Sequence, residues 1–192
     1  PQYVVNVQLG ILDGLRGTGF ELVVHPCDRN SDNFIEDARK FIELQKLYGV
    51  VVTPSLSEDE RLAEVLRDIG CEYVRIASVA LDQEQRMIVT NDRIGGREAG
   101  KHLGELGHTR VAMVTGRRSF RSAHERREGF EEGLGEFGVE VLPEYVAQGD
   151  YTFESGLARG AELIDLDPPP TAIFAANDEM AAGVMQSALI AG

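Results

Sequence analysis

The chain has no tryptophan and only two cysteines among its 192 residues. Cys27 and Cys71 lie far apart in the sequence, without the close spacing of a zinc site or a redox dithiol. This scarcity argues against a disulfide framework and against a cysteine-based metal centre. We expect both cysteines to be small interior residues, buried or half-buried.

Long hydrophobic runs are also missing. No apolar stretch approaches the ~20 residues of a membrane-spanning helix, and the first residues lack the basic-then-apolar pattern of a secretory signal. We therefore expect no membrane contact and a cytoplasmic location. Hydrophobic residues make up 43% of the chain and charged residues 27%, which is typical of a globular protein with one large domain or two small lobes.

Sequence signatures of catalysis are absent. There is no Gly-x-Ser-x-Gly elbow, no Walker loop, no Gly-x-Gly-x-x-Gly after a strand and no His-Glu-x-x-His. The four histidines show no metal-ligand spacing: His25, His102, His108 and His124. The sequence therefore predicts no enzyme, no cofactor and no metal site, and we interpret His108 as a structural residue at a helix end.

Basic residues are too few to offset the acidic ones. The chain has 19 Lys and Arg against 32 Asp and Glu, a net charge of −13 at pH 7. A surface this acidic repels nucleic-acid phosphates, and no basic stripe offsets it. We therefore expect that these residues do not bind DNA by themselves.

Apolar periodicity alternates between helical and strand types along the chain. Helices are predicted from the start of the chain to 17–19 and at 32–47, 57–70, 94–106, 123–137, 152–164 and from 178, and strands at 20–25, 50–53, 73–77, 110–115, 145–147 and 171–175. Ser57 and Glu60 are expected to form a capping box at a helix start. The alternation predicts an α/β protein with parallel sheets, right-handed crossovers and helices on both faces. Because the chain opens and closes on a helix, we expect truncated termini.

Two polar residues follow a short apolar run near the end of the chain. The run at 172–176 predicts a buried strand, and Asn177 and Asp178 come directly before the next helix. Ligands bind at the carboxyl ends of strands in open α/β sheets, next to helix starts. Asn and Asp are also ordinary helix N-cap residues. Ligand binding and capping both stay open at this point.

Four blocks of sequence follow a recognisable order at 89–116, 122–130, 148–156 and 172–183. The first contains an Asp, a Gly pair, a helix with Leu-Gly-His, a strand and Thr-Gly. The others are Ser-Ala-His-Glu-Arg-Arg-Glu-Gly-Phe, Gln-Gly-Asp-Tyr-Thr-Phe-Glu-Ser-Gly and a segment around Ala-Asn-Asp-Glu-Met-Ala. In this order and spacing the blocks resemble the effector-binding core of the LacI/GalR family of bacterial transcription regulators. They spread over about half of the chain.

The resemblance implies a periplasmic-binding-protein-like fold of two lobes joined by strand crossovers, with the ligand between them. The first crossover is expected near Thr90, so the N-terminal lobe is 1–90, incomplete, and the C-terminal lobe is 91–192. In this family a separate N-terminal helix-turn-helix domain binds the operator, and nothing in this sequence resembles one. DNA is therefore expected as a partner only through a missing domain.

The resemblance also implies ligand contacts at named residues. Arg126 matches an arginine that donates paired hydrogen bonds to ligand oxygens, although a surface arginine paired with Glu125 or Glu131 is the simpler alternative. Asn177 matches a ligand-contacting asparagine, whose amide both donates and accepts. Asp178 contacts the ligand or only caps the helix. Tyr151 corresponds to an aromatic ring against the ligand's flat face, and a core tyrosine is its alternative.

Four further site residues are expected. Ser122 and Phe120 lie in a loop that varies with the ligand among relatives, where Phe120 would form an apolar wall. Ser78 and Tyr3 are expected to face the ligand from the ends of elements of the N-terminal lobe.

Arginines crowd one short interval of this acidic chain: Arg110, Arg117, Arg118, Arg121, Arg126 and Arg127. For most of them a solvated face paired with Glu125, Glu128 and Glu131 is the simpler interpretation. A sharper hypothesis is that one of Arg117, Arg118 and Arg121 joins Arg126 in binding an acidic ligand. A uronate, an aldonate or a sugar phosphate would fit.

The last helix has almost no polar face from Met180 onward. A helix that is apolar all round must be covered on its second side, by further chain or by another subunit. The resemblance favours a homodimer, because the last helix and the opening helix lie at the dimer interface of relatives. The predicted contact residue is Val184, Met185, Ala188 or Leu189.

We conclude that the sequence favours the ligand-sensing core of a repressor, which binds a sugar, sugar acid or related metabolite and couples it to operator binding. A periplasmic sugar-binding protein of a transport system is the alternative, because it shares the two-lobed fold. An upstream helix-turn-helix would favour the regulator, and a signal peptide the transport protein.

Overall fold

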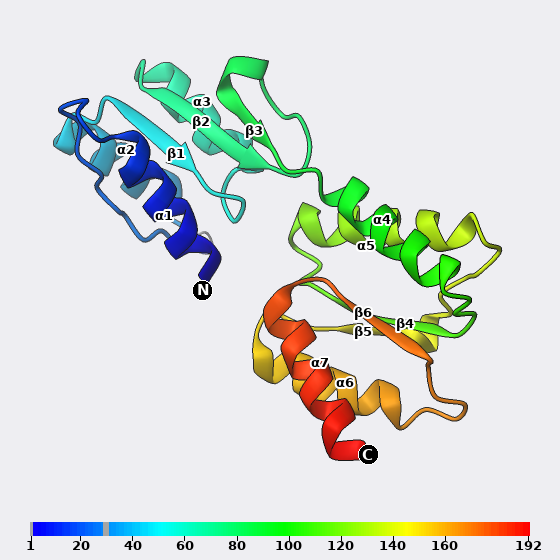
Figure 1. The fold of residues 1–192 in the computed structure, drawn as a ribbon. Coiled ribbons are helices and arrows are strands. Elements are labelled where there is room, and N and C mark those ends of the chain that lie inside the picture. The colour runs from blue at the N-terminus through cyan, green and yellow to red at the C-terminus, as the bar shows by residue number, and fades with distance from the viewer. Residues whose placement is uncertain (1, 29–30) are drawn as a thin grey trace. The chain divides into compact units, whose positions relative to one another are not determined.

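A computed structural model describes residues 2–28 and 31–192. The chain divides into two compact units, Pro1–Gln45 and Lys46–Gly192, which are described separately. The second unit contains two three-stranded sheets in which every strand pairing is parallel (Figure 1). The predicted α/β class with two parallel sheets is confirmed. The predicted lobe boundary at residue 90 falls in the link between the two sheets and stays a prediction.

The described part of the first unit contains two helices. Helix α1 spans Gln2–Gly14 and α2 spans Phe34–Gln45, which buries Phe34, Ala38 and Ile42. The strand predicted at 20–25 is wrong, since residues 20–28 form no regular structure. Val23 and Val24 are more than half exposed there. The apolar pattern is compatible with a strand, but no neighbouring strand among the unit's described residues supplies ladder partners.

The first sheet has the order β1-β2-β3. Its strands are Gly49–Val52, Glu72–Ala77 and Met87–Val89, with α3 at Glu60–Asp68 and a short 3-10 helix at Glu84–Arg86. Val50 of β1 pairs with Tyr73 of β2, and Arg75 of β2 pairs with Met87 of β3. The three-residue β3 was not predicted, because so short a run carries little periodicity.

The capping box predicted at the start of α3 is wrong. Asp59 caps this helix, because its carboxylate accepts a hydrogen bond from the Arg61 backbone N–H at 3.1 Å. Glu60 instead pairs with Arg67 and with Arg75, the latter at 3.0 Å. The Nε of the buried Arg75 donates to the Ser57 carbonyl at 2.7 Å. Two arginines therefore take the carboxylate that the box would have used.

The second sheet has the order β5-β4-β6, and its central strand is buried throughout. The strands are β4 (Val111–Thr115), β5 (Val146–Gln148, after a 3-10 turn at Pro143–Tyr145) and β6 (Ala172–Ala175). Helices α4 (Asp92–Glu105) and α5 (Arg121–Gly135) cover one face, and α6 (Phe153–Ile164) and α7 (Asp178–Ala191) cover the other (Figure 1). We call this sheet with its four helices the C-terminal module.

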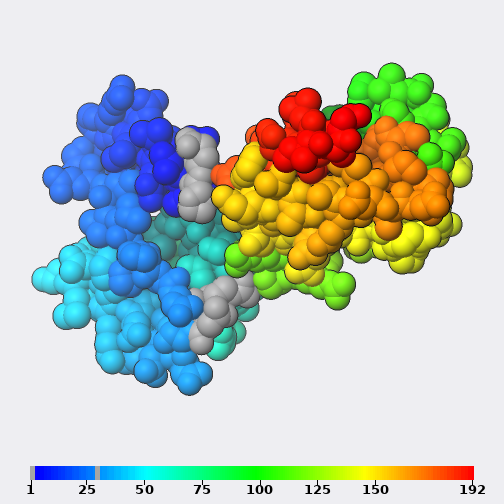
Figure 2. Space-filling view, turned by 90° about the horizontal axis from the view of Figure 1, so that it is seen from below, coloured from blue at the N-terminus to red at the C-terminus, as the bar shows by residue number. Residues whose placement is uncertain are grey.

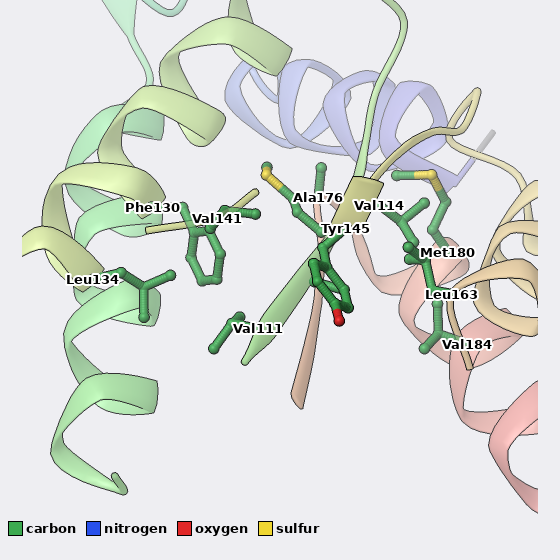
Figure 3. Packing of buried hydrophobic residues seen from close by; sticks show 12 residues of the cluster. Val111, Val114, Phe130, Leu134, Val141, Tyr145, Leu163, Ala176, Met180 and Val184 are labelled. Atoms are coloured by element: carbon green, nitrogen blue, oxygen red, sulfur yellow. The ribbon is translucent and has the colours of Figure 1, made fainter. Parts of the chain in front are cut away.

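Apolar side chains fill both faces of the C-terminal module. Phe130 and Leu134 of α5 lie on one side of the strands, and Met180 of α7 lies on the other (Figure 3). The Phe130 ring stacks on Phe174 of β6, with ring centroids 4.4 Å apart. The core therefore fixes α5 and α7 against the strands whose ends they follow.

The helices of each pair touch through glycine. A Cβ on Gly129 of α5 would overlap the Arg93 carbonyl of α4, and one on Gly96 would overlap the Arg126 carbonyl. Gly183 of α7 has the same close approach to the Phe153 carbonyl of α6. Such contacts bring helix backbones closer together than any side chain permits.

The outer side of α7 is apolar and exposed. Met185 is 68% exposed, Leu189 76% and Ile190 71%. Figure 2 shows α7 (red) at the molecular surface beside α6. Val184 is only 8% exposed and belongs to the core, so of the four alternative contact residues only Met185, Ala188 and Leu189 are open to another subunit. Val184 lies on the face of the helix that packs against the sheet.

Candidate functional site

One edge of the second sheet gathers five predicted site residues. The carboxyl ends of β4 and β6 meet at this edge, and α5 and α7 begin there. Contacts link the five residues directly or through one neighbour; they are Phe120, Ser122, Arg126, Tyr151 and Asn177. In an α/β sheet this is the edge at which ligands bind.

Arg126 is held at two points of its guanidinium. Its Nε donates to Asp92 Oδ1 at 2.7 Å, and its Nη1 donates to the Ala176 carbonyl at the end of β6. Asp92 is itself buried, and its other oxygen accepts a hydrogen bond from the Thr90 hydroxyl. The arginine is therefore fixed by a carboxylate on α4 and a carbonyl beyond β6, which orients its planar fork.

The simpler alternative for Arg126, a pairing with Glu125 or Glu131, does not occur. Glu125 pairs with Arg121 and Glu131 pairs with Arg127, both at 2.7 Å. Within the described residues, Nη2 of Arg126 makes no hydrogen bond. The side chain is 33% exposed, so this nitrogen remains available as an oriented donor.

Tyr151 lies beside Arg126 with an unsatisfied hydroxyl. Its ring covers Gly116 at the end of β4, where a Cβ would overlap the ring. The Phe120 ring lies 5.9 Å away, centroid to centroid. The hydroxyl is buried without a hydrogen-bond partner in the described residues. Burial raises the pKa of Tyr151, while the nearby Ser122 hydroxyl and the Arg126 charge act in the opposite direction.

The backbone of Tyr151 is strained. Its φ of 73° lies in the left-handed region that disfavours residues with a Cβ. The Asn177 side-chain amide donates to the Tyr151 carbonyl at 3.1 Å. This bond ties the strained residue to the start of α7.

Asn177 also caps α7. Its side-chain oxygen accepts a hydrogen bond from the Met180 backbone N–H at 3.0 Å. The capping alternative is therefore present, but the amide keeps one N–H and one lone pair free of these two bonds. Asp178 is exposed at the first position of the helix, and its contact with a ligand stays a prediction.

Ser78 and Tyr3 lie outside this group of contacts. Ser78 follows β2 of the first sheet and is half-buried. Tyr3 belongs to α1 of the first unit and is 48% exposed. Their part in a ligand site stays a prediction.

Two acidic residues at this edge were not predicted from the sequence as site residues. The pairing of Asp92 with Arg126 spans 34 positions, so only its place before a Gly pair at a helix start marked it. Asp150 accepts hydrogen bonds from the Thr152 hydroxyl at 2.6 Å and from its backbone N–H. The Thr152 hydroxyl is the main reason that the pKa of Asp150 lies below its usual range.

A surface hollow of about 420 Å³ lies at the opposite, amino-terminal end of the same strands. Its lining includes Arg110 and Tyr145. The Tyr145 hydroxyl donates to the Pro168 carbonyl at 2.7 Å, and Arg110 Nε donates to the Pro169 carbonyl. These polar groups are already engaged, so the unsatisfied donors favour the Arg126 edge as the ligand site. In the described part of the chain, no three His, Cys, Asp or Glu side chains are grouped as a metal site.

Known proteins resemble this chain in sequence and in structure. Residues 101–192 match the periplasmic binding protein-like domain. The chain is 32% identical over 179 residues to the HTH-type transcriptional regulator DegA of Bacillus subtilis, covering 91% of this chain and 52% of that protein. It is 35% identical over 187 residues to catabolite control protein A of Priestia megaterium, covering 97% of this chain and 56% of that protein.

A similar structure is the transcriptional regulator CelR–cellobiose complex, with a TM-score of 0.83 and 29% identity. The alignment covers 98% of this chain and 57% of that one. CelR of Thermobifida fusca is 32% identical over 180 residues, covering 93% of this chain and 52% of that protein. The chain thus spans about half the length of the curated relatives it matches. None of its described helices is both long and apolar enough to cross a membrane.

Proposed function

The chain has the effector-binding core of a LacI-type regulator, and from this premise we propose that it senses a small polyhydroxylated ligand at the Arg126 edge. One observation carries the proposal. Among the described residues, the Nη2 of a rigidly held arginine and the hydroxyl of Tyr151 have no hydrogen-bond partner at the end of a parallel sheet. A buried hydroxyl normally has a hydrogen-bond partner, so the unpaired hydroxyl of Tyr151 beside the oriented, partly exposed donor of Arg126 suits a ligand rich in oxygen.

A sugar or sugar derivative fits the chemistry of this edge. The arginine fork donates to vicinal hydroxyls, and the remaining amide groups of Asn177 both donate and accept. The rings of Tyr151 and Phe120 supply apolar surface for the C–H face of a pyranose. The cellobiose complex of the relative CelR supports this ligand class. No step of the proposal requires catalysis by these residues.

The signal would pass to DNA through a domain outside these residues. The net charge of −13 disfavours a direct contact with nucleic acid. A ligand that binds one conformation better than another shifts the equilibrium between the two, and a DNA-binding domain that senses this equilibrium changes its operator affinity. A repressor of this kind acts in the cytoplasm, where its operator is.

A homodimer is part of the proposal. The exposed apolar residues of α7 and the exposed Val5, Leu9 and Leu12 of α1 are the surfaces that would be covered. Identical patches that meet across a two-fold axis form a closed interface. The transport alternative is less well supported, since the relatives at 32–35% identity are transcription regulators.

Thermal shift measurements on the intact protein test the ligand site. The probes are glucose, cellobiose and glucuronate. Loss of one charge-assisted hydrogen bond costs about 1.5–3 kcal/mol, so Arg126→Gln should weaken binding of the best probe about ten- to hundredfold. Arg127→Gln is the matched control, because Arg127 pairs with Glu131 and makes the same charge change. Equal binding by Arg126→Gln and wild type would overturn the proposal.

A further inference from the structure

Two arginines next to the Arg126 edge lack the close carboxylate partners that the arginines of α4 and α5 have. Elsewhere on α4 and α5, Arg93, Arg97 and Arg127 each lie within ion-pair distance of a glutamate. In the part of the chain that the structure describes, Arg118 has no carboxylate within that distance. Arg117 reaches only the limit, 4.0 Å from Asp150. Both residues are exposed, so their guanidinium groups remain available to an anion from solvent.

Arg121 and Arg126, the arginines nearest to this pair on α5, are already neutralised. Arg126 pairs with Asp92 and Arg121 pairs with Glu125, each at 2.7 Å, and both carboxylate side chains are only 6% exposed. Arg126 therefore adds little net charge to the edge, although it keeps a directed donor. A charge on the ligand would have to be matched by Arg117 and Arg118.

The position of Arg117 and Arg118 follows from their neighbours. They come directly after Gly116, the residue that the Tyr151 ring covers, and before α5. The Arg118 carbonyl lies 2.7 Å from His124 Nε2, which fixes the loop to the first turn of α5. The Asp150 oxygen nearest Thr152 is already engaged, which leaves Arg117 a weak partner at the rim.

We propose that the ligand carries an anionic group on its polyhydroxylated body, a carboxylate or a phosphate, and that Arg117 and Arg118 bind this group. The inference rests on the proposed function and narrows its ligand class to sugar acids and sugar phosphates. Guanidinium groups suit both anions, because their N–H donors match two oxygens at once. Arg126 and Tyr151 then contact the uncharged hydroxyls.

Calorimetry on the intact protein with matched ligands tests the inference. The pairs are glucose with glucuronate and galactose with galacturonate, and glucose 6-phosphate separates a phosphate from a carboxylate. We expect at least one anionic ligand to bind tenfold or more tightly than its neutral counterpart. Its affinity should fall as salt is raised, since screening weakens exposed charge pairs.

The variant R117Q/R118Q should lose that preference, so that the anion and the neutral sugar bind within about threefold of each other. Arg127→Gln, combined with Lys101→Gln, gives the same change in net charge away from this loop and should keep the preference. Thermal melting of both variants checks that they remain folded. A neutral sugar that binds as tightly as its acid, or an unchanged preference in R117Q/R118Q, overturns the inference.

The outcomes separate this inference from the proposed function. If neutral sugars bind through Arg126 and the anions bind no tighter, only the anionic ligand class is wrong. If no saccharide of either charge binds, the proposed function fails as well.

Discussion

The buried hydroxyl of Tyr151 lowers the stability of the ligand-free protein. A buried polar group without a partner lowers stability by about 1–3 kcal/mol, and the positive φ of Tyr151 adds strain. One N–H of the Asn177 side-chain amide donates to the Tyr151 carbonyl and holds it in that conformation. These features are explained if the hydroxyl meets its partner only in the ligand complex.

Replacing Tyr151 with phenylalanine should separate stability from binding. Tyr151→Phe removes the unsatisfied hydroxyl but keeps the ring over Gly116, so the free protein should melt at the same temperature or higher. Ligand affinity should fall about tenfold if one hydrogen bond is lost. Melting curves with and without ligand measure both effects.

Tyr145→Phe is the matched control for this prediction. The Tyr145 hydroxyl donates to the Pro168 carbonyl at the opposite end of the strands, so its loss should lower the melting temperature and leave ligand affinity unchanged. A Tyr151→Phe protein that melts lower and binds normally would contradict the assignment of this hydroxyl to the ligand.

The candidate site residues were predictable to different degrees. Arg126, Tyr151 and Asn177 stand in short local blocks, and these blocks suffice to single them out. Asp92 was missed because its role is the ion pair with Arg126, and no local pattern reports a contact across 34 positions. For the same reason, the sequence did not show which of the arginines are ion-paired and which are not.

At the scale of elements, the glycine contacts between α4 and α5 determine the position of the helix that carries Arg126. Ion pairs also join the two helices on their exposed sides, Arg93 with Glu132 and Arg97 with Glu136. Exposed pairs of this kind contribute little each, about 0–1 kcal/mol. We therefore attribute the packing of the two helices to the close approach of their backbones.

Substituting glycine by alanine at two positions should have opposite effects. On helix propensity alone, alanine is favoured by about 1 kcal/mol. Gly95 has open space around its Cβ position, so Gly95→Ala should raise the free energy of unfolding by about 0.5–1 kcal/mol. A Cβ on Gly129 would overlap the Arg93 backbone, so Gly129→Ala should lower it by about 1–3 kcal/mol.

Urea unfolding of the two alanine variants measures both changes. Gly95→Ala serves as the control for helix propensity on the partner helix. If Gly129→Ala is instead more stable than the wild type, the two helices can move apart without a loss of folding free energy. The close contact would then not contribute to stability.

Elements with strong periodicity were predicted well, and the errors have tertiary causes. The helices and strands of the C-terminal module lie within about two residues of their predicted bounds. The segment at 20–25 has a strand pattern, but a strand also requires a hydrogen-bonding neighbour. The capping box at Ser57 failed because Arg67 and Arg75 compete for Glu60, and sequence spacing does not show this competition.

At the scale of the whole molecule, the exposed apolar face of α7 is the clearest sign of a partner surface. Leu189 and Met185 are largely exposed on a helix whose opposite side is in the core. Exposed apolar residues that cluster on one face mark interaction sites.

Leu189→Glu should convert the proposed dimer to a monomer, because a charge would be buried at the two-fold contact. Leu106→Glu is the control, because it also replaces an exposed leucine by a glutamate. Leu106 is 61% exposed at the end of α4. Sedimentation of the intact proteins gives the oligomeric state. A Leu189→Glu protein that sediments as a dimer argues that α7 is covered by something other than its own copy.

Glycine-to-backbone contact also limits how the C-terminal module moves. Gly96 and Gly129 lie against carbonyl groups of the neighbouring helix. If one helix slid along the other, bulkier residues would replace these glycines at the carbonyls and would collide with them. Shear between α4 and α5, or between α6 and α7, would therefore break close backbone contacts and is disfavoured. A ligand at the Arg126 edge would then displace the module as a rigid body, with the dihedral changes confined to the residues that connect it to the rest of the chain.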